Sequence, residues 1–553
     1  MKKALSVLLC AVLLLAASAP AVFAEDTVMI SSSSVPATVA YIGSDSRLAT
    51  IANVFAGYIE KITGIPASVS SSAPEANGFV LDLQTTERVF GGYDLSVSGS
   101  VVTIAASDVR GIANGMYDFL HEYCGCAWYT QDAVVVPQAE AITVPGGLSK
   151  TYETFFEYAD TDWVSPHYEE FSVANGLNGI YSPVSATYGG KVTYPGGFCH
   201  TLSTNFVSAN TYFDEHPEYF SYRKSEGGRT KDQLCLSNPE VIELVKQQAI
   251  NVAATQTSRN GAINIISLTQ DDNQRYCECD NCQAIVDRYG GQQSGIMLWF
   301  VNQVAEAVEE AGYDNVVIDT FAYQYTRKPP KDIRPRDNVC VRLCSIECCF
   351  AHALNDPDCS MNTSFMDDLK EWAKLSDRLY VWDYTTNYAQ TIGIFPDFGV
   401  LQSNIQTFYE NNVKGIYEEG AYYMSSCNAE FGDLRSYMIA RLLKDPYCDI
   451  KAEMQGFYKG FYGAAATQIS EFIDFITEHA GNSQGHLGIY YSMRDTLHGW
   501  KNKDIERMDK LWEDAIAATA DDETANARVL RSQLSWRYWK SVNKVAEFSR
   551  LQS

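Results

Sequence analysis

Short hydrophobic runs alternate with helical patterns through the middle of this chain, between about residues 150 and 445. The runs are rich in β-branched and aromatic residues and have the length of strands, and stretches of helical periodicity such as 240–255 separate them. This alternation predicts a parallel sheet in which each strand is followed by a helix. The eight candidate strands are 154–159, 176–181, 198–201, 263–269, 316–322, 339–344, 379–383 and 413–417. We therefore expect an α/β fold with a (β/α)8 TIM barrel over 148–445.

The patterns on either side of this region predict two further domains. Residues 25–147 combine strand patterns with two helical stretches, at 48–63 and 108–120, which is typical of a small α/β domain. From residue 446 to 553 the pattern is helical throughout. The helices predicted there are 451–463, 467–480, 503–518 and 523–549.

The first residues have the pattern of a secretory signal. Lys2 and Lys3 precede an apolar run, and Val22-Phe-Ala24 fits the small-x-Ala pattern of a cleavage site. We expect a signal peptide at 1–24 and a secreted, extracellular protein. No second stretch is long and apolar enough to span a membrane, so no integral membrane segment is expected after cleavage.

Composition narrows the class of partner. The formal net charge is -26 and the pI is about 4.7, which disfavours nucleic acid as a partner. The chain contains 34 Tyr and 9 Trp, and such rings can stack on the faces of sugars, although most will be core residues. A carbohydrate substrate is the partner that this composition suits, and no cofactor is expected.

A cysteine cluster stands out among the 15 cysteines. Cys277, Cys279 and Cys282 have the spacing C-x-C-x-x-C, which supplies three ligands where a closed zinc site needs four. The cluster can be a structural metal site with a fourth ligand from elsewhere, or a disulfide cluster. No catalytic metal is assigned.

Carboxylates accumulate where the predicted strands end. The strand from Ile263 runs into Asp271 and Asp272, and three other ends carry Glu347, Asp383 and Glu418. In a barrel these ends meet at one rim, where catalytic residues lie. Two carboxylates in one pocket suit glycoside hydrolysis, because one can protonate the leaving oxygen while the other attacks or activates water. An Asp pair at this place also suits the cap of a turn.

Rings and polar side chains that could contact a sugar occur near the same strand ends. Aromatic rings there could stack on a sugar, and a histidine or carboxylate could bond its hydroxyls, although each ring could also be core. The candidate substrate-binding residues are His200, Tyr323, His352, Trp382, Asp383 and Tyr384.

Several of these motifs resemble the bacterial DUF4838 family. The resemblance covers most of residues 150–450 and rests on His200-Thr201, His216-Pro-Glu-Tyr-Phe220, Cys235-Leu-Ser-Asn-Pro239, the segment 270–282, Ala322-Tyr323, Trp382-Asp-Tyr384 and the run 437–446. It implies a glycosidase-like barrel related at fold level to α-glucuronidases and β-hexosaminidases. Asp108-x-Arg-Gly111 and Cys124-Gly-Cys-Ala-Trp-Tyr129 likewise resemble the domain that precedes the barrel in those enzymes.

Two lines of reasoning disagree over which aspartate is catalytic. Strand alternation puts Asp271 on the same face as Ser267 and Thr269, which favours Asp271. The family pattern, in which the first position is often Asn and the second is kept, implies Asp272. We follow the resemblance, with Asp272 as general acid and Asp271 as its partner.

The sequence thus predicts an exported glycoside hydrolase that acts on a poly- or oligosaccharide or a glycoconjugate. Glu418 is the expected base or nucleophile, with Glu347 and Asp383 as substitutes. In a β-hexosaminidase-like variant, Asp271 would orient a substrate acetamido group. Two alternatives stay open, a non-catalytic carbohydrate-binding protein on a glycosidase scaffold and a metal-dependent hydrolase.

Overall fold

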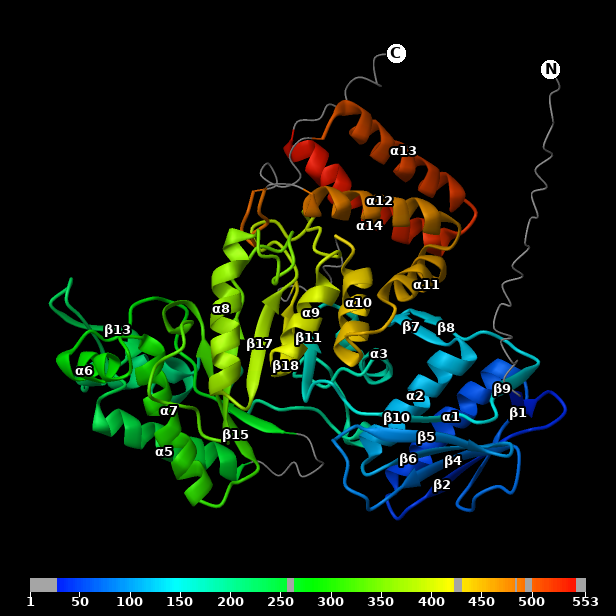
Figure 1. Ribbon diagram of the computed structural model, residues 1–553, viewed down its shortest axis with the longest axis horizontal. Coiled ribbons are helices and arrows are strands. Elements are labelled where there is room, and N and C mark those ends of the chain that lie inside the picture. Colours follow the sequence, from blue (N-terminus) through cyan, green and yellow to red (C-terminus); the bar gives the residue numbers. More distant parts are fainter. Residues whose placement is uncertain (1–26, 256–262, 422–429, 483–484, 493–499, 544–553) are drawn as a thin grey trace, which may run out of the picture.

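The computed structural model describes residues 27–255, 263–421, 430–482, 485–492 and 500–543 (Figure 1). The predicted signal peptide 1–24 lies outside the described residues, as does the end of the last predicted helix. An N-terminal α/β region, a central parallel sheet and a group of C-terminal helices follow one another along the chain (Figure 1).

The N-terminal region is a mixed six-stranded sheet whose order is β10-β5-β6-β4-β2-β3. Two helices, α1 (Arg47–Thr63) and α2 (Val109–Cys124), pack on it. The helix α2 lies very close to the sheet, since a Cβ on Gly111 would come 2.3 Å from the Gly92 carbonyl oxygen. The strands are β2 (Thr38–Ile42), β3 (Ser68–Ser70), β4 (Gly78–Leu83), β5 (Tyr93–Ser98), β6 (Val101–Ala106) and β10 (Ser149–Tyr152), with antiparallel pairs β1 (Thr27–Ser32)–β9 (Ala141–Pro145) and β7 (Ala127–Thr130)–β8 (Ala133–Val135) beside them.

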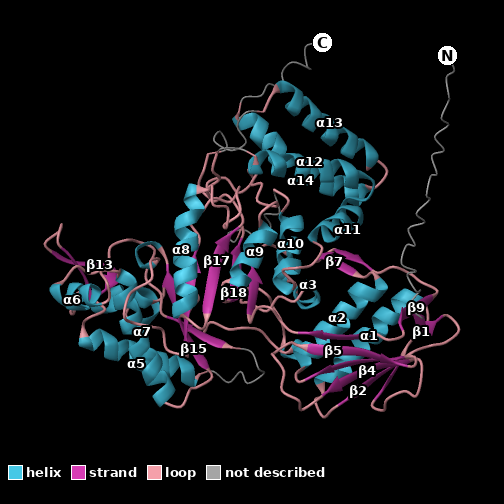
Figure 2. Cartoon of the chain, viewed as in Figure 1, coloured by secondary structure: helices cyan, strands magenta, loops and turns pink. Residues whose placement is uncertain are grey.

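The central sheet has six parallel strands in the order β11-β18-β17-β16-β15-β14. Helices follow most strands, as the alternating pattern predicts, and cover the sheet (Figure 2). The strands are β11 (Tyr158–Thr161), β14 (Asn264–Ser267), β15 (Val316–Ala322), β16 (Val339–Cys344), β17 (Leu379–Tyr384) and β18 (Val413–Glu419). The main helices are α5 (Pro239–Ala254), α7 (Gln293–Glu310), α8 (Ser360–Leu375), α9 (Leu401–Glu410) and α10 (Gly432–Lys444).

Two of the eight predicted strands are not strands. The candidates 176–181 and 198–201 are loops. Gly176 and His200 within them adopt positive φ, as do Gly196 and Gly197 just before the second candidate, and such a backbone does not continue a strand. A few isolated contacts take the place of the missing ladders. The Asn178 amide donates to the Ala159 carbonyl (3.0 Å), and the Thr201 amide donates to that of Thr269 (3.1 Å). Over the described residues the sheet is therefore a curled half-barrel.

Smaller elements project from the sheet beside α5 and α7 (Figure 1). They include the antiparallel hairpin of β12 (Phe220–Arg223) and β13 (Gly228–Leu234). The short helices of the central region are α3 (Glu169–Ala174), α4 (Ala209–Tyr212) and α6 (Asp280–Arg288).

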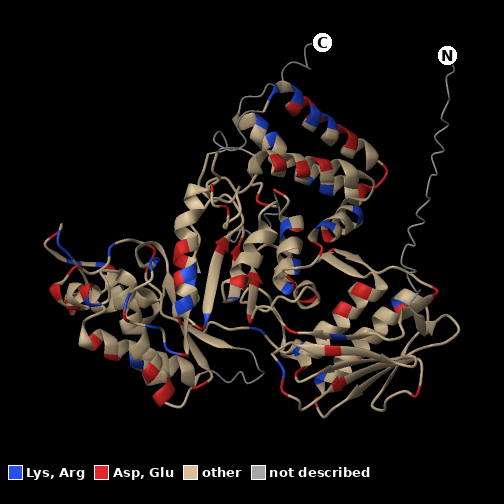
Figure 3. Cartoon of the chain, viewed as in Figure 1, with Lys and Arg blue, Asp and Glu red and all other residues tan. Residues whose placement is uncertain are grey.

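Four helices form the C-terminal region, as predicted: α11 (Ile450–Tyr462), α12 (Ala466–Gly481), α13 (Asn502–Ala518) and α14 (Glu523–Val542). They pack through aromatic rings, with the ring of Phe472 in α12 4.9 Å from that of Trp512 in α13 and 5.9 Å from that of Trp536 in α14. Acidic and basic residues are mixed along the outer helix α13 (Figure 3). Among the described helices, none combines the length and the apolar character needed to cross a bilayer.

Candidate active site

A cavity of about 350 Å³ opens at the carboxyl ends of the parallel strands. Acidic residues lie at the ends of β17 and β18 (Figure 3), and aromatic rings form most of the wall. The lining residues are Tyr181, Phe198, Cys199, His200, Asp272, Phe321, Tyr323, Cys344, Ile346, Trp382, Tyr384, Tyr388, Tyr417, Glu419 and Tyr490. A concave site of this size, with aromatic rings and a small number of carboxyl and imidazole groups, is typical of a small-molecule pocket.

Glu419 is the last residue of β18 and lines the cavity. The Trp382 indole N–H donates to its Oε2 at 2.6 Å. Burial raises the pKa of Glu419 to about 8, the charge of Asp162 adds to this, and the charge of Asp272 contributes in the same direction. Glu419 therefore carries a proton at neutral pH, as a general acid must.

Asp272 lies in the turn after β14 and lines the same cavity. The Tyr323 hydroxyl donates to Asp272 Oδ1 at 2.9 Å, while the Gln324 amide donates to that hydroxyl at 2.8 Å. Because Gln324 donates to the Tyr323 oxygen, the hydroxyl proton of Tyr323 points away from Gln324 and toward Asp272. This hydrogen bond positions the Asp272 carboxyl group.

Glu418, the predicted partner of Asp272, lies outside the cavity. Successive side chains of a strand point to opposite faces, so Tyr417 and Glu419 face the cavity and Glu418 faces away. Its side chain is fully buried, and burial raises its pKa, with the charge of Asp383 adding to the effect. Asp383 also faces away from the cavity, because its neighbours Trp382 and Tyr384 on β17 line the cavity.

The other two predicted carboxylates also lie elsewhere. Asp271 accepts a hydrogen bond from Ser203, and Gln233 binds both its backbone amide (3.2 Å) and its carbonyl (2.8 Å). The alternation argument fails here, since the regular strand β14 ends at Ser267, before Asp271. Glu347 is exposed and forms an ion pair with Arg327 at 3.2 Å.

Four predicted substrate-binding residues line the cavity, namely His200, Tyr323, Trp382 and Tyr384. His200 has a left-handed backbone (φ 52°), and its Nδ1 bonds the Gln270 carbonyl oxygen at 2.7 Å. Because a carbonyl only accepts, Nδ1 carries the proton, and Nε2 is the nitrogen that can bond a ligand. His352 is not part of the cavity and lies beside Cys349 instead.

A buried cation lies behind the aromatic wall. Arg342 is fully buried, forms an ion pair with Asp319 and donates to the Phe198 carbonyl at 2.8 Å. Its guanidinium lies 4.4 Å from the ring of Phe198 and 5.4 Å from that of Trp382. These contacts hold two rings of the cavity in place through cation–π attraction.

The sequence reasoning did not single out Glu419, Tyr181, Phe198 or Tyr388, and it offered Tyr490 only as one of several C-terminal aromatics that could line a cleft. The alternation of side chains along β18 could have identified Glu419, because Glu419 lies two residues after Tyr417 and therefore faces the same side of the sheet. Tyr181 and Phe198 come from the glycine-rich loops that replace strands, and Tyr490 comes from the C-terminal region. No periodicity identifies residues of that kind.

Two groups of sulfur and nitrogen ligands lie apart from the cavity. Cys235 joins the predicted cluster of Cys277, Cys279 and Cys282, and a second group consists of Cys349, His352, Cys359 and His486. Within the described part of the chain no cysteines form a disulfide, so a disulfide cluster at Cys277, Cys279 and Cys282 is not what the structure contains.

Solved glycoside hydrolases have a similar fold. The 4-O-methyl-α-glucuronidase BtGH115A of family GH115, described as specific for decorated arabinogalactans, is 10% identical, with a TM-score of 0.53 over 94% of this chain and 73% of that one. A GH138 enzyme targeting pectin rhamnogalacturonan II is 11% identical, with a TM-score of 0.46 over 92% and 68%. CpGH89 of Clostridium perfringens is 12% identical, with a TM-score of 0.46 over 90% and 62%.

Sequence comparison gives a family and no characterised relative. No curated protein matches the chain significantly. The model of the family described as "Domain of unknown function (DUF4838)" matches residues 128–474, which include Asp272, Glu419 and most of the cavity. The chain belongs to the DUF4838 family.

Proposed function

We propose that this protein is an exported glycoside hydrolase in which Glu419 is the general acid and Asp272 is the nucleophile or the general base. One observation carries the proposal. Two carboxyl groups from different strand ends line one aromatic cavity, and the pKa of one of them is raised to about 8. Carboxyl groups in distinct environments are what acid/base cleavage of a glycosidic bond requires.

The contacts of each carboxyl group support its role. Trp382 donates to Oε2 of Glu419, so the acid proton resides on Oε1, from which it can pass to the leaving oxygen. Asp272, held by Tyr323, then attacks the anomeric carbon or removes a proton from water. This assignment reverses the acid role expected for Asp272 from the sequence.

The wall of the cavity suits a sugar. Trp382, Tyr384 and Phe198 offer rings for stacking, and His200 Nε2 can accept a hydrogen bond from a sugar hydroxyl. The fold shared with BtGH115A supports a glycosidase scaffold. A poly- or oligosaccharide or a glycoconjugate is the proposed substrate class, and the signal-like N-terminus supports the proposed export.

A panel of aryl glycosides and oligosaccharides tests this function. We expect the purified protein to turn over at least one glycoside, and Glu419→Gln to lose about 10²-fold or more on the oligosaccharide. Glu418→Gln is the matched control, because it makes the same change one residue away on the opposite face of β18, and it should retain activity. Sugar binding without turnover would instead identify a non-catalytic carbohydrate-binding protein.

A further inference from the structure

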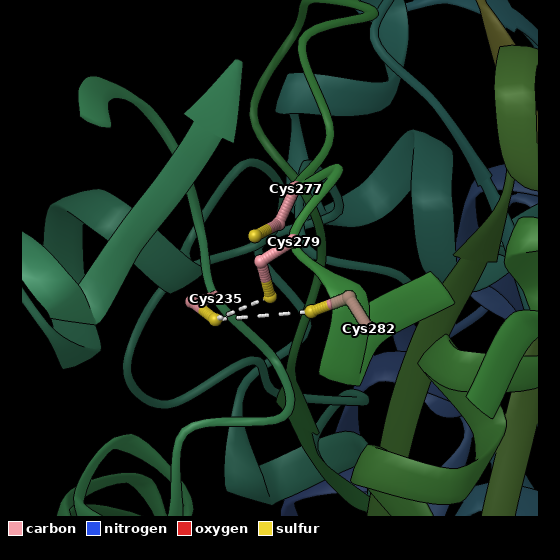
Figure 4. Close-up of side chains that lie close together, drawn as sticks. All are labelled: Cys235, Cys277, Cys279 and Cys282. Carbon is pink, nitrogen blue, oxygen red and sulfur yellow. Dashed lines mark hydrogen bonds between the residues drawn. The ribbon is translucent and has the colours of Figure 1, made fainter. Parts of the chain in front are cut away.

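We propose that Cys235, Cys277, Cys279 and Cys282 bind one structural zinc ion. The four sulfur atoms come together from a strand end, a loop and a helix start (Figure 4), within 4.8 Å of one another. Cys235 follows β13, Cys277 and Cys279 follow the turn that carries Asp272, and Cys282 lies in the first turn of α6. Cys235 is thus the fourth ligand that C-x-C-x-x-C lacks.

The sulfur spacing fits tetrahedral zinc. Cys235 Sγ lies 3.7 Å from the Sγ atoms of both Cys279 and Cys282. Zinc–sulfur bonds of about 2.3 Å in a tetrahedron separate neighbouring sulfurs by about 3.8 Å. All four sulfurs lie within 4.8 Å of one another, whereas a disulfide joins sulfurs at about 2.05 Å.

The surroundings suit thiolates. The Tyr222 amide donates to Cys277 Sγ at 3.3 Å, and Arg229 Nη1 lies 3.6 Å from the same sulfur. A site of four thiolates and Zn²⁺ has a net charge of about -2, which N–H donors and a guanidinium stabilise. Four protein ligands leave no open position, so the site is structural.

Such an ion would fix the loop that carries Asp272. Gln233, two residues before Cys235, binds the backbone of Asp271 through both atoms of its side-chain amide. The metal would therefore join the segment of Gln233 and Cys235 to Cys277, which follows Asp272 closely along the chain.

A second group carries an independent inference of the same kind. We propose that Cys349, His352, Cys359 and His486 bind another zinc ion. Cys349 Sγ lies 3.4 Å from His352 Nδ1, and Cys359 Sγ lies 3.7 Å from His486 Nδ1. Tetrahedral zinc with mixed ligands separates sulfur from nitrogen by about 3.6 Å. The Leu487 amide also donates to Cys349 Sγ, at 3.4 Å.

This second ion would join two parts of the chain that are far apart in sequence. Three ligands come from the segment between β16 and α8, and His486 lies just before Tyr490, which lines the cavity. The site would hold the C-terminal region against the rim of the sheet.

Metal analysis of the purified full chain tests both sites. After purification without chelator, we expect inductively coupled plasma mass spectrometry to find about two zinc ions per chain. Cys279→Ser and His486→Ala should each retain about one, so each variant keeps the other site as an internal control of folding. Cys448→Ser removes a cysteine outside both groups and should retain about two.

Measurements on the wild type alone keep the inference testable if a variant fails to fold. Modification of the thiols should release both ions, and Co²⁺ added to the chelator-stripped protein should give the visible bands of tetrahedral thiolate sites. Wild-type protein that contains less than about 0.2 zinc per chain and rebinds none would overturn both sites, and iron in place of zinc would overturn the choice of metal. These readouts do not depend on the proposed glycosidase activity.

Discussion

A pair of adjacent carboxylates follows or ends two strands of the central sheet, and the two pairs are oriented alike. After β14 the pair is Asp271 and Asp272, and at the end of β18 it is Glu418 and Glu419. In each pair the second residue lines the cavity and the first does not. The environments of the two cavity residues differ, since Glu419 is half-buried beside Trp382 and Asp272 is exposed beside Tyr323.

The comparison teaches that the environment, and not the residue type, separates the two roles. The pKa of Glu419 rises to about 8 because burial disfavours its charge and two aspartates add to the effect. A carboxyl group that keeps its proton serves as the acid, which leaves Asp272 for the other role.

The largest expected effect is within the β14 pair. Asp272→Asn should lower kcat by about 10³-fold or more on every glycoside, because it removes the nucleophile or base itself. Asp271→Asn is the matched control and should cost less than about tenfold, as its side chain bonds Ser203 outside the cavity. Steady-state kinetics on one substrate decide the matter, and equal losses in both variants would remove the distinction between the two aspartates.

The next effect depends on the leaving group. Glu419→Gln should lose about 10²-fold or more on a natural oligosaccharide, whose leaving oxygen needs a proton, and far less on an aryl glycoside with an acidic leaving group. A plot of kcat/KM against leaving-group pKa should be steeper for the variant than for the wild type. The same slope in both proteins would exclude Glu419 as the acid.

The pH dependence of activity sharpens the contrast further. Because the proton-bearing form of Glu419 is the active one, kcat/KM should fall about tenfold per pH unit above the pKa of about 8. Glu419→Gln should abolish this alkaline limb on an activated aryl glycoside. A limb that persists in the variant would belong to another group.

The stability of the protein should follow the same residue with a defined sign. The folded-state pKa of Glu419, about 8, lies above its ordinary value of 4.5, so the folded state binds the proton more tightly. The contribution of Glu419 to the free energy of unfolding is complete below pH 4.5 and is lost as the pH rises toward 8. Urea unfolding at several pH values should show a smaller decline over this interval in Glu419→Gln than in the wild type.

The smallest effect concerns orientation. Tyr323→Phe removes the hydroxyl that bonds Asp272 and should lower kcat about tenfold with little change in KM. Tyr384→Phe, on the same wall, serves as control for the loss of a tyrosine hydroxyl. A loss confined to KM in Tyr323→Phe would mean that the hydroxyl binds substrate and does not position Asp272.

Much of the scaffold could be predicted because its strands are continuous apolar runs. The candidates at 316–322 and 339–344 match β15 and β16 at both ends, and the C-terminal helices follow their periodicity. The predictions at 176–181 and 198–201 were wrong because these segments bond the sheet only around isolated residues such as Asn178 and Thr201, and such contacts need no periodic pattern in the sequence.

The site was less predictable for a related reason. Strand ends identified the right rim, and Asp272, His200, Tyr323, Trp382 and Tyr384 all line the cavity. Alternation decides which of two neighbours faces inward, and it can be applied only where the strand continues. Alternation holds for β18, which reaches Glu419, but it misleads after β14, which stops at Ser267; there the family resemblance chose Asp272, which lines the cavity.

The loops that replace two strands form part of the cavity wall without being part of the sheet. Tyr181, Phe198 and His200 line the cavity from backbone that belongs to no ladder. Exchanging these side chains would keep the hydrogen bonds of the six paired strands, although Phe198 packs on Arg342 and Trp382 and His200 bonds the Gln270 carbonyl. A library that varies this wall alone would therefore be the most economical way to redirect the cavity toward a different sugar.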